Sequence, residues 1–565
     1  MLARVPPLDL SRRALLKAAA AVPALAVPAF AAETGGRADG PFRHGVASGD
    51  PLGTGVVLWT RVTPARDAVP GSGRGPAVRV VWELAADRSF SRVLRSGTVV
   101  TSAALDHTVK VDVRGLRPYT RYHYRFRALG ATSPVGRTQT AGDDGRLHAL
   151  RLALVSCSNY TGGWFTPYRH LARRTDLDLV VHLGDYLYEY GNGDDRYGPE
   201  ALRGIRDHVP AVEPRTLAQY RARHGHYKTD PDLQAAHAAH PWVVILDDHE
   251  VANDAWAEGA ENHQAGEGSF RARRAAAYRA YVEWMPIRVP SGGSPRFWRR
   301  FSFGPLADLS VIETRGSRSQ QAAGVSGALV GLDPTAVNDP GRQIMEPAQM
   351  AWLTKGLRDG SRRWHLVGNQ TVFARVAAPR DLPGRDRLLA AGIPVQAGVF
   401  NTDQWDGYGD DQLEVLRAMA ASSADTVVLT GDIHSSWAND LPLDSGSYVP
   451  GVTPSAGVEV VCPSVTSDGF AEILGGPQPA AVATGALQAM NPHLRYLDGV
   501  GHGYTVLDVT PEQVQADFWF VSDREDPRAT QRLASSWLTR HGSRTMSPAP
   551  GPIGRRSDHP RAATP

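Results

Sequence analysis

Six short apolar runs, each followed at once by polar side chains, limit what this chain of 565 residues can fold into. They are Leu150–Ser156, Leu179–Leu183, Trp242–Leu246, Leu309–Glu313, Trp364–Gly368 and Thr426–Thr430. Longer stretches of helical character separate them, and such alternation is typical of an α/β domain. In α/β sheets, ligands bind beyond the carboxyl ends of the strands. The sequence therefore predicts one large α/β domain over residues 146–525, with its site at these strand ends.

The segment before this domain has a different pattern. Between residues 41 and 140, β-type runs such as Val56–Val62 and Thr108–Val113 alternate with turn residues, which favours a small β-sandwich. The stretch Gly115–Phe126 resembles a corner of fibronectin-like modules in which a Tyr anchors the strand. We therefore expect an N-terminal β-sandwich module, joined to the α/β domain by the Gly- and Asp-rich linker Ala141–Gly145.

The N-terminal segment has the features of an export signal. Arg12 and Arg13 precede a mildly apolar run over residues 18–32 that ends in small residues, Ala29-Phe30-Ala31. This combination is typical of twin-arginine signal peptides with their cleavage site. We expect residues 1–31 to be such a signal, the twin-arginine export machinery to be a partner, and the mature protein to be secreted, periplasmic or at the cell surface.

Composition argues against other classes of protein. Lys and Arg total 61 against 58 Asp and Glu, and they form no dense basic block, so we expect no stable nucleic-acid partner. The N-terminal apolar run is too short and too rich in Ala to span a bilayer, which argues against an integral membrane protein. Residues 543–565 are rich in Pro, Gly, Arg and Ser, which predicts a disordered tail.

The polar residues at the strand ends form a set suited to metal ions. They are Ser156–Asn159, Gly184–Tyr188, Asp247–Glu250, Gly368–Gln370 and Gly431–His434. Carboxylates, imidazoles, a thiolate and a phenolate together suit a hard or trivalent ion beside divalent ions, as in two-metal phosphoesterases. Asp185 follows the central strand and is the candidate for bridging two ions. The glycines before Asp185 and Asp432 are expected to permit tight turns at the sheet edge.

Longer motifs around these residues resemble those of PhoD-type alkaline phosphatases, of the metallophosphatase superfamily. The motifs are Cys157, His182–Gly191, Asp247–Val251 and Leu429–Trp437, with further likeness at Gly45–Pro51, Val57–Arg61, Gln404–Tyr408 and Asn491–His493. The likeness extends from about Pro41 to Val521. It implies a four-layer α/β metallophosphatase-like sandwich with a β-rich N-terminal module.

The resemblance also implies cofactors and roles for single residues. It implies one iron(III) and two calcium ions, with the metal ligands Cys157, Asp185, Tyr188, Asp248, Asp432 and His434. Of these, Asp248 is a calcium-ligand candidate, the other five would hold the iron, and Asp185 would be shared with calcium. His249 would face the substrate. Weaker candidates for contacting the phosphate or supporting the ligands are Asn253, Arg315, Asn369 and Gln370.

The sequence departs from the family pattern at two places. Glu313-Thr314-Arg315 stands where relatives tend to have Asp-Thr-Arg, which is a mild change. His502-Gly503-Tyr504 stands where they tend to have Arg-Gly-Tyr, so a titratable side chain replaces a permanent cation. The second change leaves the substrate preference open.

The predicted function is hydrolysis of phosphate monoesters, diesters or both by an exported, metal-dependent enzyme. A water or oxide between the ions would be the nucleophile, because coordination lowers its pKa, and no Ser lies in a recognisable nucleophile-elbow motif. His249 could protonate or hydrogen-bond an ester oxygen. One alternative is a phospholipase D-like phosphodiesterase acting on phospholipid or cell-wall polyol phosphate. A more distant alternative is an exported structural calcium-binding protein, which would give Cys157 and Tyr188 no role.

Cys157 and Cys462, the only cysteines, allow two exclusive interpretations. Export and the count of two favour a disulfide. A disulfide sulfur, however, cannot be a thiolate ligand. Cys462 lies in an apolar strand and is then a small buried hydrophobic residue. We favour the interpretation of Cys157 as a ligand, largely on the resemblance.

Overall fold

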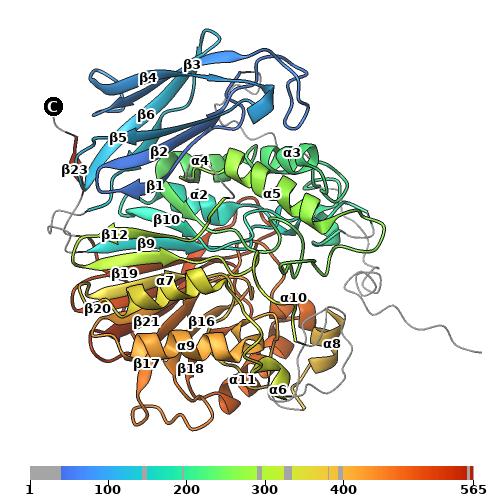
Figure 1. The fold of residues 1–565 in the computed structure, drawn as a ribbon, viewed down its shortest axis with the longest axis vertical. Coiled ribbons are helices and arrows are strands. Elements are labelled where there is room, and N and C mark those ends of the chain that lie inside the picture. The colour runs from blue at the N-terminus through green and yellow to red at the C-terminus, as the bar shows by residue number, and fades with distance from the viewer. Residues whose placement is uncertain are drawn as a thin grey trace, which may run out of the picture.

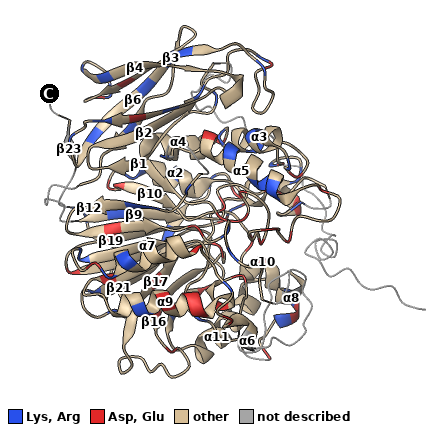
Figure 2. Ribbon diagram, viewed as in Figure 1, with Lys and Arg blue, Asp and Glu red and all other residues tan. Residues whose placement is uncertain are grey.

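The computed structural model describes residues 40–142, 149–193, 196–288, 295–322, 334–378, 381–391, 399–556 and 560–563. The export signal predicted at residues 1–31 lies outside these ranges. Within them, three β-sheets and their covering helices are stacked in layers (Figure 1). No helix in the described part of the chain is long and apolar enough to cross a membrane. Basic and acidic residues are interspersed along the ribbon (Figure 2).

The largest sheet combines strands from both ends of the chain. Its spatial order is β22 (Ser547–Pro548), β21 (Gln531–Arg540), β20 (Gln513–Val521), β19 (Gly503–Val509), β9 (Leu150–Val155), β10 (Leu179–His182), β11 (Pro241–Val244), β1 (Val46–Leu52), β2 (Gly55–Arg61) and β5 (Thr108–Arg114). Strands β9, β10, β11 and β1 run parallel, so their carboxyl ends meet at one edge. Strand β19 lies antiparallel beside β9.

The second sheet supplies the other half of the α/β domain. Its spatial order is β12 (Arg299–Phe303), β13 (Ala307–Val311), β14 (Trp364–Gly368), β15 (Asp425–Thr430), β17 (Ser455–Val461), β16 (Ser436–Pro442) and β18 (Leu494–Asp498). Strands β13, β14, β15 and β17 are parallel. The six strands predicted from the sequence correspond to β9, β10, β11, β13, β14 and β15, with ends that differ by at most two residues.

The two large sheets pack face to face, and helices cover their outer faces. Leu154 and Val181 of the first sheet share one apolar core with Leu309 and Leu429 of the second. The first sheet is covered by α2 (Thr166–Arg173), α3 (Leu217–Tyr227), α4 (Pro231–Ala239) and α5 (Phe270–Trp284). The second is covered by α7 (Pro347–Leu357), α9 (Gly409–Ala420), α10 (Phe470–Leu474) and α11 (Pro477–Met490). This order of layers confirms the predicted four-layer α/β sandwich.

Shorter helices lie in the connections between these elements. They are α6 (Pro334–Val337), α8 (Arg385–Ala390) and the 3₁₀-helices η1 (Ala103–Leu105), η2 (Tyr160–Gly162), η3 (Glu200–Leu202) and η4 (Trp405–Gly407). In Figure 1, α3, α4 and α5 lie on the side of the N-terminal module, whereas α9 and α11 lie at the opposite end of the molecule.

The N-terminal segment forms a β-sandwich that shares a sheet with the α/β domain. Its outer sheet contains β3 (Val78–Ala85), β4 (Val93–Thr101), β6 (Thr120–Ala128), β7 (Ala131–Thr132) and β8 (Gly136–Gln139). Its inner sheet is the β1–β2–β5 end of the ten-stranded sheet, and both pack on one apolar core. The Tyr122 hydroxyl accepts a hydrogen bond from the Arg117 N–H at 2.9 Å, as in a tyrosine corner. The predicted border near residue 141 therefore divides the sequence but not the sheet.

The C-terminal segment corrects the prediction of a disordered tail from residue 543. The chain is described up to residue 556, and β22 extends the large sheet beside β21. Arg544 donates to Asp425 at 2.9 Å, and Arg556 donates to the buried Asp178. Beyond it, β23 (Arg561–Ala562) pairs with β6. Arginine–carboxylate pairs and single apolar contacts, such as Met546 in the core between the sheets, anchor the segment without a periodic apolar pattern.

Candidate active site

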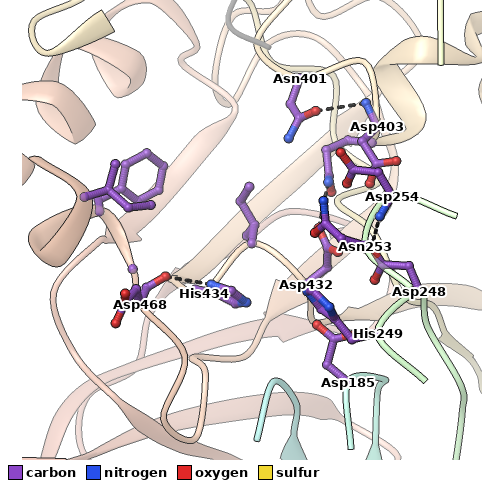
Figure 3. Close-up of a pocket in the computed structure, with 15 residues that line it drawn as sticks. Asp185, Asp248, His249, Asn253, Asp254, Asn401, Asp403, Asp432, His434 and Asp468 are labelled. Atoms are coloured by element: carbon purple, nitrogen blue, oxygen red, sulfur yellow. Dashed lines mark hydrogen bonds between the residues drawn. The ribbon is translucent and has the colours of Figure 1, made fainter. Parts of the chain in front are cut away.

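A pocket lies at the carboxyl ends of strands from both large sheets, as the sequence predicts. Asp185 follows β10, Asp248 and His249 follow β11, and Asp432 and His434 follow β15. Figure 3 shows these side chains directed toward the same space. The pocket is lined by Asp185, Asp248, His249, Asn253, Asp254, Asn401, Asp403, Gln404, Asp432, Ile433, His434, Asp468, Gly469, Phe470 and Ile473.

The six predicted metal ligands come together around Asp185. Three groups of ligating side chains have their atoms within 4.8 Å of one another: Cys157, Asp185 and His434; Asp185, Asp248 and His249; and Asp185, Asp247, Asp248 and Asp432. Tyr188 joins them, because its hydroxyl lies 3.0 Å from Asp185 Oδ2 and 3.1 Å from His434 Nε2. Asp185 belongs to all three groups, which is the arrangement required of a bridging carboxylate.

Four of these residues have left-handed backbone conformations. The φ angles are 58° at Cys157, 56° at Asp185, 63° at Asp432 and 54° at His434. Residues with side chains rarely adopt such angles, and those that do are concentrated at functional sites. The four turns bring side chains from three strand ends into one space.

The two glycines before the aspartates serve different purposes. Gly184 has a φ of 114°, and a Cβ there would lie 2.5 Å from Asp247 Cβ. Gly431 has no left-handed angle, but a Cβ there would lie 2.7 Å from Ser156 Cβ. The turn predicted from the sequence is therefore present at Gly184, whereas Gly431 is required by the close approach of Ser156.

Two histidines are oriented by hydrogen bonds from behind the pocket. His434 Nδ1 donates to the carbonyl oxygen of Asp468 at 2.7 Å, which turns Nε2 toward Tyr188. His249 Nδ1 lies 2.7 Å from the buried carboxylate of Glu189. Burial alone would raise the pKa of Glu189, but His249 beside it lowers this pKa below its ordinary value. Glu189 therefore remains an anion that holds the His249 ring in place.

The electrostatics of the cluster favour bound cations. Burial, and then the neighbouring Asp248 and Asp247, raise the pKa of Asp185 well above its ordinary value. Burial and Asp185 likewise raise the pKa of both Cys157 and Tyr188. These groups become anionic together only when positive charge lies among them. The oxygens Asp185 Oδ1, Asp247 Oδ2 and Asp248 Oδ1 are buried and accept no hydrogen bond from the described residues, so they suit metal ligation.

Arg315 lies behind the carboxylates and does not line the pocket. Its guanidinium contacts Asp247 at 2.5 Å, Asp403 at 2.8 Å and Asp432 at 3.1 Å. It also lies 3.7 Å from Asp248, and despite burial it helps to lower the pKa of that carboxyl. Of the two roles that the sequence left open for Arg315, this placement favours support of the ligands over contact with phosphate.

The other predicted support residues differ in their placement. Asn253 lines the pocket, and its backbone N–H donates to Glu189 at 2.8 Å. Asn369 and Gln370 are buried and do not line it. Trp405 Nε1 donates to Asn369 Oδ1 at 3.0 Å, and Gln370 donates to the carbonyl oxygens of residues 246 and 312 at 3.0 and 2.8 Å. Phosphate contact by these last two is therefore not supported.

Two residues that support the site were given no role by the sequence analysis. Asp403 holds both Arg315 and Arg318 at 2.8 Å. Glu250 accepts the N–H groups of Asp185 at 3.2 Å and Asp247 at 2.6 Å, which ties two ligand loops together. Asp403 stands directly before the Gln404–Tyr408 motif, and Glu250 belongs to the Asp247–Val251 motif. The strand-end position of Glu250 and the motif beside Asp403 are the signals by which the sequence could indicate them.

The departure at His502 lies outside the pocket lining. Its Nδ1 lies 2.9 Å from Ser464 Oγ, and its Nε2 lies 3.0 Å from Glu472 Oε1. Glu472 in turn accepts the N–H of Gly469 at 2.8 Å at the start of α10. His502 therefore positions the beginning of α10, rather than contacting the pocket itself.

The two cysteines form no disulfide in the structure. Cys157 and Cys462 are both buried and both free. The Ser156 hydroxyl contacts both sulfurs, at 3.2 Å from Cys157 and 3.4 Å from Cys462. The two cysteines therefore share one neighbour, although Cys157 lies among the ligating groups and Cys462 belongs to the apolar core between the sheets.

Comparisons with known proteins agree over most of the chain. The family model of the PhoD-like phosphatases matches residues 152–518, and that of the PhoD-like phosphatase N-terminal domain matches residues 29–142. Alkaline phosphatase D of Bacillus subtilis (strain 168) is 36% identical over 504 residues, 88% of this chain and 80% of that protein. A solved structure of PhoD is 33% identical in sequence to this chain. The match covers 93% of this chain and 94% of the PhoD chain, with a TM-score of 0.78.

Proposed function

This chain belongs to the PhoD-like phosphatase family, and from that premise we propose that it is an exported, metal-dependent hydrolase of phosphate monoesters, diesters or both. The observation that carries the metal dependence is the sharing of Asp185 by three groups of buried ligating side chains. Buried carboxylates at such distances repel one another unless cations lie among them. We do not propose a purely structural calcium-binding role, because the family consists of phosphatases.

The donor set suits two kinds of ion. Iron(III) stabilises thiolate and phenolate ligands, which Cys157 and Tyr188 would supply. The oxygen ligands Asp185 and Asp248 suit calcium. When bound, the ions supply Lewis acidity that polarises the ester and acidifies a water molecule. The ligands that we assign to iron(III) are Cys157, Asp185, Tyr188, Asp432 and His434.

The chain's own side chains would orient the substrate and move a proton. Because Glu189 holds Nδ1 of His249, Nε2 is the ring nitrogen that can exchange a proton with an ester oxygen. Asn253 lines the same pocket and can present its amide to a phosphate oxygen. Arg315 would hold Asp247 and Asp432 in place as the substrate binds.

The export proposal rests on the N-terminal sequence. The Arg12-Arg13 pair and the small-residue site ending at Ala31 support delivery by the twin-arginine machinery. That route carries folded proteins, so metals can be loaded before export. The substrate would be met outside the cytoplasm, as a small phosphate ester, a phospholipid or a cell-wall polymer.

Removal of calcium is expected to abolish hydrolysis of both p-nitrophenyl phosphate and bis(p-nitrophenyl) phosphate. The oxygens of Asp185 and Asp248 are hard ligands, and without the ions neither charge neutralisation nor activation of water takes place. The measurement is the rate after exhaustive dialysis against EGTA, with calcium measured by elemental analysis, and again after calcium is restored. Full activity in a sample free of calcium would contradict the proposal.

Replacement of the two cysteines is expected to have unequal effects. Thiolate and phenolate bound to iron(III) produce a visible charge-transfer band. Cys157→Ser is expected to shift or remove this band and to lower kcat by about 100-fold. Cys462→Ser, a matched change in the apolar core, is expected to preserve both. Absorption spectra and iron content separate the two variants, and equal loss from both would show that Cys157 has no special role.

A further inference from the structure

One part of the pocket lining is apolar. Ile433, Phe470 and Ile473 line the pocket together with its carboxylates and histidines, and we call these three residues the apolar wall. Ile433 stands between Asp432 and His434 in the sequence. Phe470 and Ile473 are three residues apart in α10, so they lie on the same face of that helix. The wall therefore begins directly beside two of the proposed metal ligands.

The start of α10 is anchored to the rest of the site. The carbonyl oxygen of Asp468, two residues before the helix, accepts the hydrogen bond from His434 Nδ1 at 2.7 Å. Arg524 forms an ion pair with the Asp468 side chain. Glu472 closes the first turn through Gly469 at 2.8 Å. The wall therefore has a fixed position relative to His434, which a specific substrate contact requires.

The apolar wall keeps surface exposed inside the pocket. Phe470 is buried against Phe400, at 6.1 Å between ring centroids, and forms the base of the wall. Ile433 and Ile473 are only partly buried, although both pack on the core of the second sheet. Exposed apolar surface is unfavourable in water until something covers it. A phosphate group makes polar contacts only, so it does not account for this surface.

Most polar side chains of the pocket lie on the other side of His434 from Asp468 (Figure 3). Figure 3 shows Asp468, which precedes the wall, on one side of His434, and Asn401, Asp403 and Asp254 on the other. A substrate whose phosphorus lies among the carboxylates can therefore direct its substituent either toward the wall or toward the polar groups. The chemical nature of the substituent decides between these directions.

We propose that the apolar wall binds the organic substituent of the phosphate ester, and that the enzyme therefore prefers esters of aryl or alkyl groups to esters of polyols. This inference rests on the proposed phosphoesterase function and adds a substrate class to it. Methylene groups gain by leaving water for the side chains of Ile433 and Ile473. Polyol hydroxyls against the same surface would lose hydrogen bonds to water without replacement.

The test compares matched substrates that differ only in this substituent. One pair is hexyl phosphate and glycerol 1-phosphate, both primary alkyl monoesters. The other pair is methyl hexyl phosphate and methyl glyceryl phosphate, which also allows the activity of a diesterase to be measured and carries no aryl group that could occupy the wall in both members. In the metal-loaded enzyme, kcat/KM for the hexyl member is expected to exceed that for the glyceryl member by about ten-fold or more.

Ile473→Ser is expected to lower this hexyl-to-glyceryl ratio by about ten-fold, because it removes apolar surface from the wall. Ile205→Ser is the matched control, since Ile205 is 62% exposed and does not line the pocket. The hexyl-to-glyceryl ratio of this control variant is expected to equal that of the unmodified enzyme. A ratio of one or less, or an Ile473→Ser variant that loses activity equally on both members, would overturn the proposal. Hydrolysis of no substrate at all would instead contradict the proposed phosphoesterase function.

Discussion

The Asp185→Asn variant is expected to lose about 1,000-fold or more in kcat and to retain less metal than the unmodified enzyme. The change preserves the size of the side chain but removes its charge and one ligating oxygen. Asp185 belongs to all three groups of ligating side chains, so no neighbour can take its place. It also accepts the hydrogen bond from Tyr188 at 3.0 Å. Steady-state kinetics and metal content, measured on the same preparation, give the result.

Asp444→Asn is the matched control for this variant. It makes the same chemical change in a surface turn that contributes nothing to the pocket lining. Its kcat and metal content are expected to equal those of the unmodified enzyme. If Asp185→Asn bound its full complement of metals and kept kcat within ten-fold of normal, Asp185 would not be the bridging ligand.

The Arg315→Met variant is expected to be destabilised by about 3–5 kcal/mol when metals are absent. The substitution leaves the carboxylates of Asp247, Asp403 and Asp432 buried without the cation that contacts all three. Bound metal ions supply positive charge to Asp247 and Asp432, which belong to one ligating group, so the loss is expected to be smaller in the metal-loaded enzyme. Urea unfolding with and without EGTA measures the difference.

Arg273→Met distinguishes this effect from the general cost of losing a buried arginine. Arg273 is also buried and pairs with Glu213 at 2.7 Å, but neither residue belongs to the ligating groups. Its destabilisation is expected to be the same with and without EGTA. An Arg315→Met variant that behaves in this way would show that Arg315 does not share its carboxylates with metal ions.

The sequence predicts where strands end better than it predicts how the next side chain is directed. Asp185 and Gln370 both follow buried strands, and both were candidates for the site. Asp185 adopts a left-handed backbone conformation that directs it into the pocket. Gln370 instead donates to two backbone carbonyl oxygens and holds neighbouring loops together. The backbone conformation at Asp185 and the hydrogen-bond partners of Gln370 are properties of the folded chain, and the strand pattern that both residues share does not distinguish them.

Contacts between distant parts of the chain account for the other differences. The sequence indicates the N-terminal strands, but the pairing of β1 with β11 joins residue 48 to residue 241, so the continuous sheet has no local signature. Arg544 and Arg556 anchor the C-terminal segment through carboxylates at residues 425 and 178. The family resemblance, by contrast, was confirmed, because it depends on motifs spread along the whole chain.

The pairing of β19 with β9 has a consequence for how the protein is made. Strand β9 carries Cys157 just beyond its end, yet its partner on one side, β19, begins only at residue 503. A growing chain that already contains every proposed ligand, the last of which is His434, thus still lacks this neighbouring strand. Contacts between residues so far apart in sequence form slowly. The large sheet can therefore be completed only once β19 to β22, close to the end of the chain, have been made. On the proposed twin-arginine route, which carries folded proteins, export would follow this last pairing.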